Sequence, residues 1–317
     1  MTLRDVRHRA EYAIVLALRG AIAIVPDAPA RGLGSLIGLA FCVLDPRHRR
    51  VATEQLQAAF PTRSAAEVRA IVRATFAHFG RLLVFVLRLS TLTRDELRAL
   101  IEIEGESHFR AALASGRGVL IFTGHFGFWE VQGLAHALVW PRLCVLARPL
   151  DNPYLHRFLE RTRESTGNRV IYRQGAMRRV LRALQSNETV AMLIDQHIQP
   201  SNAVMVDFFN RPAATTTAVA TLALRTGAPL VPIFALPLPG GRVRLVYEHP
   251  VPLPPPDSPD PVRELTQSCT DVLEMYVRRY PQLWLWMHRR WRDGDEPVGE
   301  RGMFPTAAGG DPEAVDS

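Results

Sequence analysis

The sequence of 317 residues predicts an α/β protein whose central sheet is mostly parallel and is flanked by helices. From residue 101 onward, short runs rich in Val, Ile and Leu alternate with segments of helical length. This alternation is typical of strand–helix–strand units, which build parallel sheets. Hydrophobic residues make up 47% of the chain, enough for a large core. Before residue 101 the pattern is helical, so we expect the sheet to begin there.

Residues 1–45 read as two apolar helices separated at Pro26-Asp27-Ala28-Pro29. Neither apolar stretch reaches the ~20 residues that span a bilayer. Arginines surround the first stretch, and an apolar helix with such flanks suits the cytoplasmic face of a membrane, where it lies in the interface or tilts inward. We therefore predict membrane-associating helices over 1–45. A buried core helix and a true span are the alternatives.

Residues 46–292 are predicted to form one α/β domain with a helical N-terminal part. Ser64-Ala65-Ala66-Glu67 has the form of a capping box, and apolar residues follow it at helical spacing. A short helix is expected to start at Thr93. Residues 293–317 are rich in Gly, Pro, Asp and Glu and are predicted to be disordered.

The strands and helices of the α/β part follow from the apolar runs and their glycine or proline boundaries. We expect strands at 101–105, 118–123, 143–147, 169–172, 189–194, 229–235 and 243–247. We expect helices at 108–115, 126–138, 152–165, 177–186, 216–226 and 261–280.

The formal net charge is +7, and every one of the 38 basic Lys/Arg positions is arginine. This charge favours acidic partners such as a phosphorylated lipid, an anionic membrane or an acidic carrier protein. Nucleic acid is not an expected partner, because the arginines are dispersed and no zinc-finger or RNA-binding signature is found. Cys42, Cys144 and Cys269 are scattered without CxxC spacing, which predicts buried free thiols.

The heptad GHFGFWE, residues 124–130, contains the candidate catalytic pair. His125 follows the strand at 118–123, and the carboxyl ends of strands carry the ligands in α/β sheets. Glu130 lies in the first turns of the next helix, from which it can turn back to one ring nitrogen. Such a contact fixes the tautomer and makes the other nitrogen a better base. The spacing does not match helical zinc ligands, so no metal is predicted. A structural pair that caps the helix is the alternative.

The nucleophile for such a base is expected to come from the substrate. The chain has no G-x-S-x-G sequence, which would place a serine at a nucleophile elbow. A base, a bound hydroxyl and an activated acyl group together make a direct acyl transfer that needs no cofactor.

Several segments resemble known proteins. TGHFGFWE resembles the H-x4-D/E motif of the glycerolipid acyltransferase superfamily, and its Glu form resembles the bacterial lipid A (late, lauroyl/myristoyl-type) acyltransferases. Residues 147–171, 190–234 and 280–292 are similar to further blocks of that branch, as is RRVATEQLQAAFP near residue 50. The resemblance covers nearly the whole chain apart from the tail.

The resemblance implies an enzyme at the cytoplasmic face of the inner membrane. It would move a fatty acyl chain from acyl carrier protein to a hydroxyl of a glycolipid such as a lipid A precursor. It further implies that His125 is the general base, Glu130 its partner, and Arg148 a contact of the acceptor phosphate. Asp195 and Gln196 match the third motif and are implied to bind substrate.

Other interpretations remain open. The acceptor could be a phosphatidylinositol mannoside, a lysophospholipid or an aminolipid, and water as acceptor would give a thioesterase. A catalytically inactive lipid-binding protein of the same fold is a further alternative, against which the intact His125 and Glu130 argue. Phe128 departs from the asparagine of many members, which leaves the acceptor and chain length open. Two of the implied site residues also have a structural alternative. Arg148 could form a surface ion pair, and Asp195 could be an N-cap or turn residue.

Overall fold

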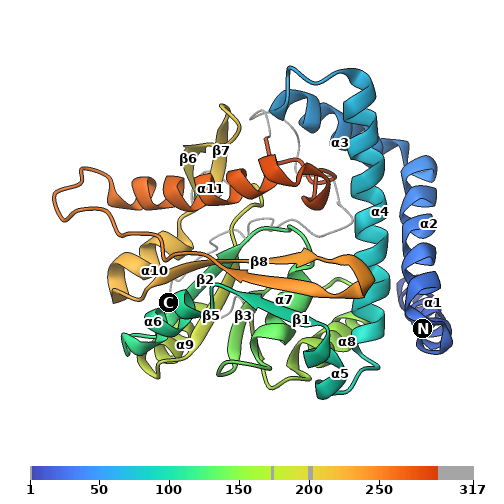
Figure 1. Ribbon diagram of the computed structural model, residues 1–317, viewed down its shortest axis with the longest axis horizontal. Helices are drawn as coiled ribbons and strands as arrows, with labels where there is room; N and C mark the ends of the chain where they lie inside the picture. The colour runs from blue at the N-terminus through green and yellow to red at the C-terminus, as the bar shows by residue number, and fades with distance from the viewer. Residues whose placement is uncertain (1, 173–174, 199–202, 292–317) are drawn as a thin grey trace.

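A seven-stranded sheet forms the centre of the computed structural model, which describes residues 2–172, 175–198 and 203–291 (Figure 1). The strand order is β1-β9-β8-β2-β5-β3-β4, and β8, β2, β5, β3 and β4 run parallel. β9 and β1 run the other way, since β9 pairs antiparallel with β8. The mostly parallel sheet is therefore confirmed. The strands are β1 Ile101–Glu104, β2 Val119–Thr123, β3 Leu143–Ala147, β4 Arg169–Tyr172, β5 Thr189–Leu193, β8 Leu230–Pro237 and β9 Val243–Tyr247.

Helices cover both faces of this sheet. The connections β2–α7–β3 and β3–α8–β4 both move towards the β4 edge of the sheet. The connection β4–α9–β5 moves back towards β2. Because such connections are right-handed, α7 and α8 lie on one face and α9 on the other. α10 packs against β2 and α11. The helices are α6 Glu106–Ala114, α7 Trp129–His136, α8 Pro153–Glu164, α9 Ala176–Gln185, α10 Ala218–Thr226 and α11 Pro261–Arg279.

Two local differences from the sequence prediction have clear causes. The helix expected at 126–138 begins only at Trp129, because Gly127 has φ +58° and Phe128 is not helical. The segment before α10 contains an antiparallel pair that was not predicted, β6 Ala203–Asp207 and β7 Pro212–Thr216, which takes Thr216 from the expected helix.

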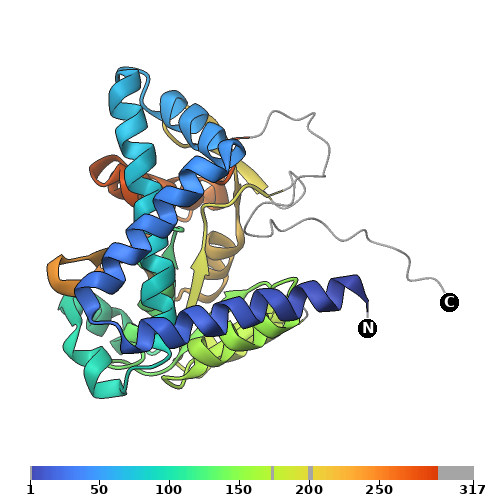
Figure 2. The same ribbon diagram turned by 90° about the vertical axis from the view of Figure 1, so that its right-hand side faces the viewer.

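The N-terminal part is helical, as predicted: α1 Leu3–Ile24, α2 Asp27–Leu44, α3 Pro46–Ala59, α4 Ala65–Leu89 and α5 Arg94–Ala99. The capping box at the start of α4 is confirmed, with Ser64 accepting from the backbone of Glu67 and the Glu67 side chain accepting from Ser64. α1 lies along α8 (Figure 2), where Asn152 Nδ2 donates to the carbonyl of His8 at 2.9 Å. Asp45 ends α2 and caps α3, so the predicted boundary at residue 45 has no linker. The predicted tail, 293–317, lies outside the described residues.

α2 and α4 pack side by side through glycines (Figure 1). A Cβ on Gly38 would lie 2.0 Å from the carbonyl oxygen of Phe76, and one on Gly80 would lie 2.0 Å from that of Gly34. The backbones of the two helices therefore touch, as in the small-residue helix contacts of membrane proteins.

Within the described residues, α2 and α4 are long and apolar enough to cross a membrane. The same test is passed by core helices, and 56% of the α4 window is buried in the protein against 22% of the α2 window. α4 is thus largely a core helix. α2 leaves Leu36, Val43 and Leu44 exposed by 66%, 70% and 79%, so its apolar surface is largely uncovered.

Replacing Gly38 by alanine is expected to destabilise the protein by about 1–3 kcal/mol, because the methyl group cannot fit without moving α2 away from α4. Gly32→Ala in the same helix is the matched control. No atom lies within 4 Å of a Cβ at Gly32, so alanine there should stabilise α2 by about 0.5–1 kcal/mol. Thermal unfolding of both variants in the same detergent measures the difference. Equal melting temperatures would contradict the close helix contact.

Candidate active site

The end of β2 and the end of β5 bring the candidate residues together. β2 and β5 are parallel neighbours, and their register pairs Thr123 with Leu193. The chain remains paired one step further, where the Ile194 amide donates to the Thr123 carbonyl at 3.0 Å. His125 and Asp195 therefore lie side by side at the carboxyl edge of the sheet. Both are buried, with 8% and 3% of their surface exposed.

The Asp195 carboxylate orients His125. Its Oδ1 lies 2.8 Å from His125 Nδ1, and its Oδ2 accepts from the backbone N–H of His125 at 2.7 Å and from Trp284 Nε1 at 2.8 Å. Burial acts to raise the pKa of Asp195, but the charge and hydrogen bonds of His125 and the Trp284 hydrogen bond outweigh it, so the pKa is lowered. An ionised carboxylate only accepts, so Nδ1 carries the hydrogen and Nε2 can accept a proton.

Glycines allow this arrangement. A Cβ on Gly124 would lie 2.9 Å from Asp195 Oδ2, so a larger residue would push the carboxylate away from His125. At Gly127, φ is +58° and a Cβ would lie 2.1 Å from the Ala235 carbonyl oxygen. The Gly127 amide donates to the Leu283 carbonyl at 2.9 Å, which ties the loop to the C-terminal segment.

Glu130 has a different partner from the one we predicted. Its oxygens accept from Arg163 of α8, at 2.6 Å from Nη2 and 3.0 Å from Nε. The expected hydrogen bond to His125 is not formed in this structure, and Asp195 takes that position. Burial acts to raise the pKa of Glu130, but the charge and hydrogen bonds of Arg163 outweigh it, so the pKa is lowered, with a smaller contribution from His125. Glu130 therefore stays charged beside the site and joins α7 to α8.

The two other predicted site residues lie at the same edge of the sheet. Arg148 directly follows β3, the strand next to β5, and is exposed. Gln196 follows Asp195 and is half-buried. Their position agrees with a substrate-facing location, while their roles remain predictions.

Three aromatic and basic neighbours of the site were not predicted. Trp284 holds Asp195, Arg163 pairs with Glu130, and the Trp129 ring packs edge-on against His125 at 5.4 Å between ring centres. Trp284 lies in the segment 280–292, one of the blocks that carry the family resemblance. Trp284, Trp286 and Arg290 are 1%, 0% and 1% exposed and belong to the core. The only sequence signal for Trp284 was that resemblance block.

No protein nucleophile accompanies the histidine within the described part of the chain. There the imidazole makes one side-chain hydrogen bond, to Asp195, and none to a serine, threonine or cysteine. Cys42, Cys144 and Cys269 are buried free thiols, as predicted, and burial raises the pKa of each. The imidazole is thus held through Nδ1, and its Nε2 has no hydrogen bond to another side chain among the described residues.

A buried histidine that a carboxylate orients, within an H-x4-E sequence, fits the acyltransferase class that the sequence motifs resemble. Comparison with known sequences gives the same class. The family described as "Bacterial lipid A biosynthesis acyltransferase" matches residues 2–293, and the chain belongs to this family. The family resemblance inferred from the sequence motifs is thereby confirmed.

Individual relatives cover most of the chain. A lipid A biosynthesis lauroyltransferase of Escherichia coli K12 is 28% identical over 259 residues, 80% of this chain and 82% of that protein. A lipid A biosynthesis palmitoleoyltransferase of the same strain is 24% identical over 276 residues, 86% and 87% of the two chains. A phosphatidylinositol mannoside acyltransferase of Mycolicibacterium smegmatis is 26% identical over 226 residues, 70% and 72%. The relatives therefore include two kinds of acceptor lipid.

Proposed function

We propose that this acyltransferase moves a fatty acyl chain from acyl carrier protein to a hydroxyl of a lipid A precursor or a related glycolipid. The observation that carries the proposal is the buried His125–Asp195 pair, whose available Nε2 faces no protein nucleophile among the described residues. The family match and the relatives named for lipid A support the acceptor class.

In the proposed reaction, His125 Nε2 takes the proton of the acceptor hydroxyl as its oxygen attacks the thioester carbonyl carbon. The new C–O bond forms, the C–S bond breaks, and the leaving thiolate takes the proton back from the imidazolium. Asp195 stabilises the imidazolium through Nδ1. The acyl chain passes directly between substrates, so no acyl-enzyme forms.

Glu130 is proposed to act as a positioning residue. Its ion pair with Arg163 joins the first turn of α7 to α8, and α7 begins directly after the loop that carries His125. Both side chains are largely buried, 17% and 22% exposed, so the pair is screened little by solvent. The H-x4-E spacing would then serve to fix the loop rather than to hold the ring.

Membrane attachment through the N-terminal helices is part of the proposal. The largely uncovered apolar face of α2 supports it, as do the lipid-modifying relatives. The cytoplasmic face of the inner membrane fits the proposed donor, because acyl carrier protein is found on that side.

A reconstituted assay tests the proposal. The purified protein in detergent is given acyl-ACP or acyl-CoA with a lipid A precursor, and the products are identified by mass spectrometry. We expect an O-acylated acceptor with acyl-ACP as the better donor, and less activity at high salt, because the protein is basic and the carrier acidic. Release of free fatty acid alone would contradict the proposal in favour of a thioesterase.

A phosphatidylinositol mannoside is the second candidate acceptor. The relative from Mycolicibacterium smegmatis supports it at 26% identity. Offering both acceptors in one assay decides between them. Lipid profiles of cells with and without the gene give the same answer in the native membrane.

Arg148→Ala is expected to raise the KM for a phosphorylated acceptor about tenfold while leaving the donor KM nearly unchanged. The guanidinium is exposed at the sheet edge that carries His125, and its planar fork suits phosphate. Arg148→Lys should give an intermediate KM for the phosphorylated acceptor, because lysine keeps the charge but lacks the planar fork. Steady-state kinetics with acceptors that have and lack the phosphate measure the effect. An equal penalty for both acceptors would show that Arg148 does not bind the phosphate.

A further inference from the structure

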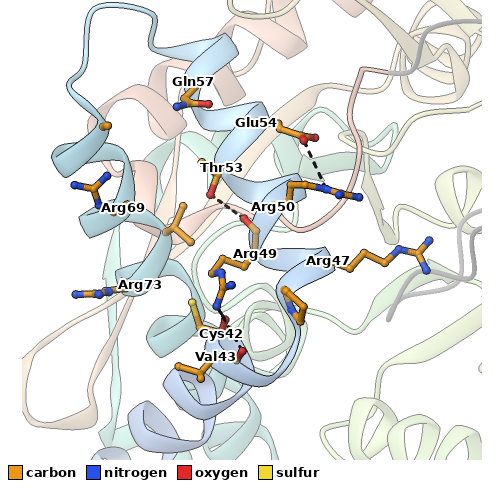
Figure 3. Close-up of a pocket in the computed structure, with 13 residues that line it drawn as sticks. Cys42, Val43, Arg47, Arg49, Arg50, Thr53, Glu54, Gln57, Arg69 and Arg73 are labelled. Carbon is orange, nitrogen blue, oxygen red and sulfur yellow. Dashed lines mark hydrogen bonds and ion pairs between the residues drawn. The ribbon is translucent and has the colours of Figure 1, made fainter.

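A groove of about 910 Å³ lies outside the catalytic site, where the end of α2 meets α3 and the start of α4 (Figure 3). Its lining contains one carboxylate, Glu54, and five arginines: Arg47, Arg49, Arg50, Arg69 and Arg73. None of these residues touches the chemistry described above. The groove therefore concentrates positive charge for which the catalytic mechanism gives no reason.

The arginines of the groove lie at positions where the helices disfavour positive charge. Arg47, Arg49 and Arg50 stand in the first turns of α3, a helix end that carries partial positive charge and whose capping carboxylate, Asp45, is already paired with His48. Arg69 and Arg73 are four residues apart on α4, where like charges repel (Figure 3). An anion in the groove would relieve both conflicts.

The acidic groups of the described chain do little to neutralise the groove. Arg50 reaches Glu54 at 3.7 Å, with both side chains more than half exposed. Arg49 donates to the carbonyls of Cys42 and Val43 at the end of α2. Arg69 and Arg73 form no hydrogen bond or ion pair with any residue the structure describes, and both are exposed. The α4 side of the groove thus presents two guanidinium groups to a ligand.

The neighbouring surface indicates what the ligand is. Val43 lines the groove and is also part of the exposed apolar surface of α2, together with Leu36 and Leu44. Apolar side chains thus lead directly into the arginines, as hydrocarbon leads into headgroup phosphate at the surface of a bilayer. The volume suits a small ligand, whereas a stable protein partner needs a face of about 800 Å².

We propose that this arginine groove binds the phosphate headgroup of an anionic membrane lipid while α2 contacts the acyl region. The inference rests on the membrane attachment included in the proposed function, and it assigns the groove to lipid binding rather than to the transferred substrate. Guanidinium groups supply paired, charge-assisted hydrogen bonds to phosphate oxygens. The groove would thereby select anionic membranes and orient the enzyme on them.

Vesicle flotation of the full-length protein tests this. The probes are vesicles of phosphatidylcholine alone and with about one third phosphatidylglycerol. Arg69→Gln/Arg73→Gln should weaken binding to the anionic vesicles about 30-fold, since one arginine at an anionic surface is worth about fivefold. Binding to the neutral vesicles should not change.

Arg178→Gln/Arg182→Gln is the matched control. This pair has the same four-residue spacing on α9, is exposed, and forms no hydrogen bond or ion pair within the described chain. It should leave anionic binding within about twofold of wild type. An equal loss in both double variants would overturn the groove in favour of overall charge. Wild-type binding that does not depend on phosphatidylglycerol would also overturn the proposal.

The acidic carrier protein is the competing occupant, and a third readout addresses it. If Arg69→Gln/Arg73→Gln raises the KM for acyl-ACP in detergent and leaves vesicle binding unchanged, the groove is a carrier dock and the lipid proposal is wrong. Flotation needs no turnover, so a failed acyltransferase assay would leave this result interpretable. Thermal unfolding checks that each variant is folded.

Discussion

His125→Ala is expected to lower kcat about 10²–10⁴-fold, the usual contribution of a general base. The imidazole is the base in the proposed reaction, and Asp195 is its one side-chain hydrogen-bond partner within the described residues. Alanine leaves the acceptor hydroxyl protonated, whereas the lipid contacts that set KM remain. Initial rates with saturating donor and acceptor in detergent measure the loss.

His48→Ala is the matched control for that experiment. His48 Nδ1 lies 2.7 Å from Asp45 Oδ2, so it forms a His–Asp pair of nearly the same length on the helical N-terminal part. Its loss should change kcat by less than about twofold, because the pair lies away from the sheet edge. A His125→Ala enzyme with near-normal turnover and a normal melting temperature would refute the mechanism.

Asp195→Asn is expected to lower kcat by a similar 10²–10⁴-fold, and more than Glu130→Gln does. Asparagine keeps the shape but can present N–H to Nδ1, which favours the wrong ring tautomer, and it no longer stabilises the imidazolium. The equivalent change in the serine-protease triad lowers turnover about 10⁴-fold. Kinetics of the two variants under the same conditions compare the two carboxylates.

Glu130→Gln should act mainly on stability. Breaking a buried ion pair by removing one charge costs about 3 kcal/mol, and Arg163 would remain without its counter-ion. Folding lowers the pKa of Glu130, so this stabilisation is present above the unfolded pKa of about 4 and is lost as pH falls towards the folded value. An assay near pH 7 therefore reports the full effect. A larger kcat loss for Glu130→Gln than for Asp195→Asn, at equal stability, would show that Glu130 orients the ring.

The order of strands and helices could be predicted because each element has its own period and boundary signals. The fully buried β2 is a continuous apolar run, and α4 has a capping box followed by helical spacing. The β6–β7 pair was missed because small and polar residues such as Pro212-Ala213-Ala214-Thr215-Thr216 carry no strand signal. α11 supports this pair, with Gln267 bonding both the N–H and the carbonyl of Asp207.

The partner of His125 could not be chosen from the sequence in the same way. Glu130 is five residues away and was the natural candidate, whereas Asp195 is seventy residues away on another strand. Their proximity follows from the pairing of β2 with β5, which depends on the whole strand order. Only the resemblance to a known motif drew attention to Asp195. Local spacing drew attention to His125, and the sheet topology determines which carboxylate contacts it.

The glycine contact between α2 and α4 has a consequence for which hydroxyl is acylated. Gly38 rests on the backbone of Phe76 in α4, and two residues later His78 Nε2 donates to the Gly127 carbonyl, in the loop after His125. These contacts connect α2, through α4, with the loop that follows His125. With α2 seated in a lipid layer as proposed, His125 stands at one fixed height above the hydrocarbon. The enzyme would then choose among the hydroxyls of an acceptor by their depth as well as by their chemistry.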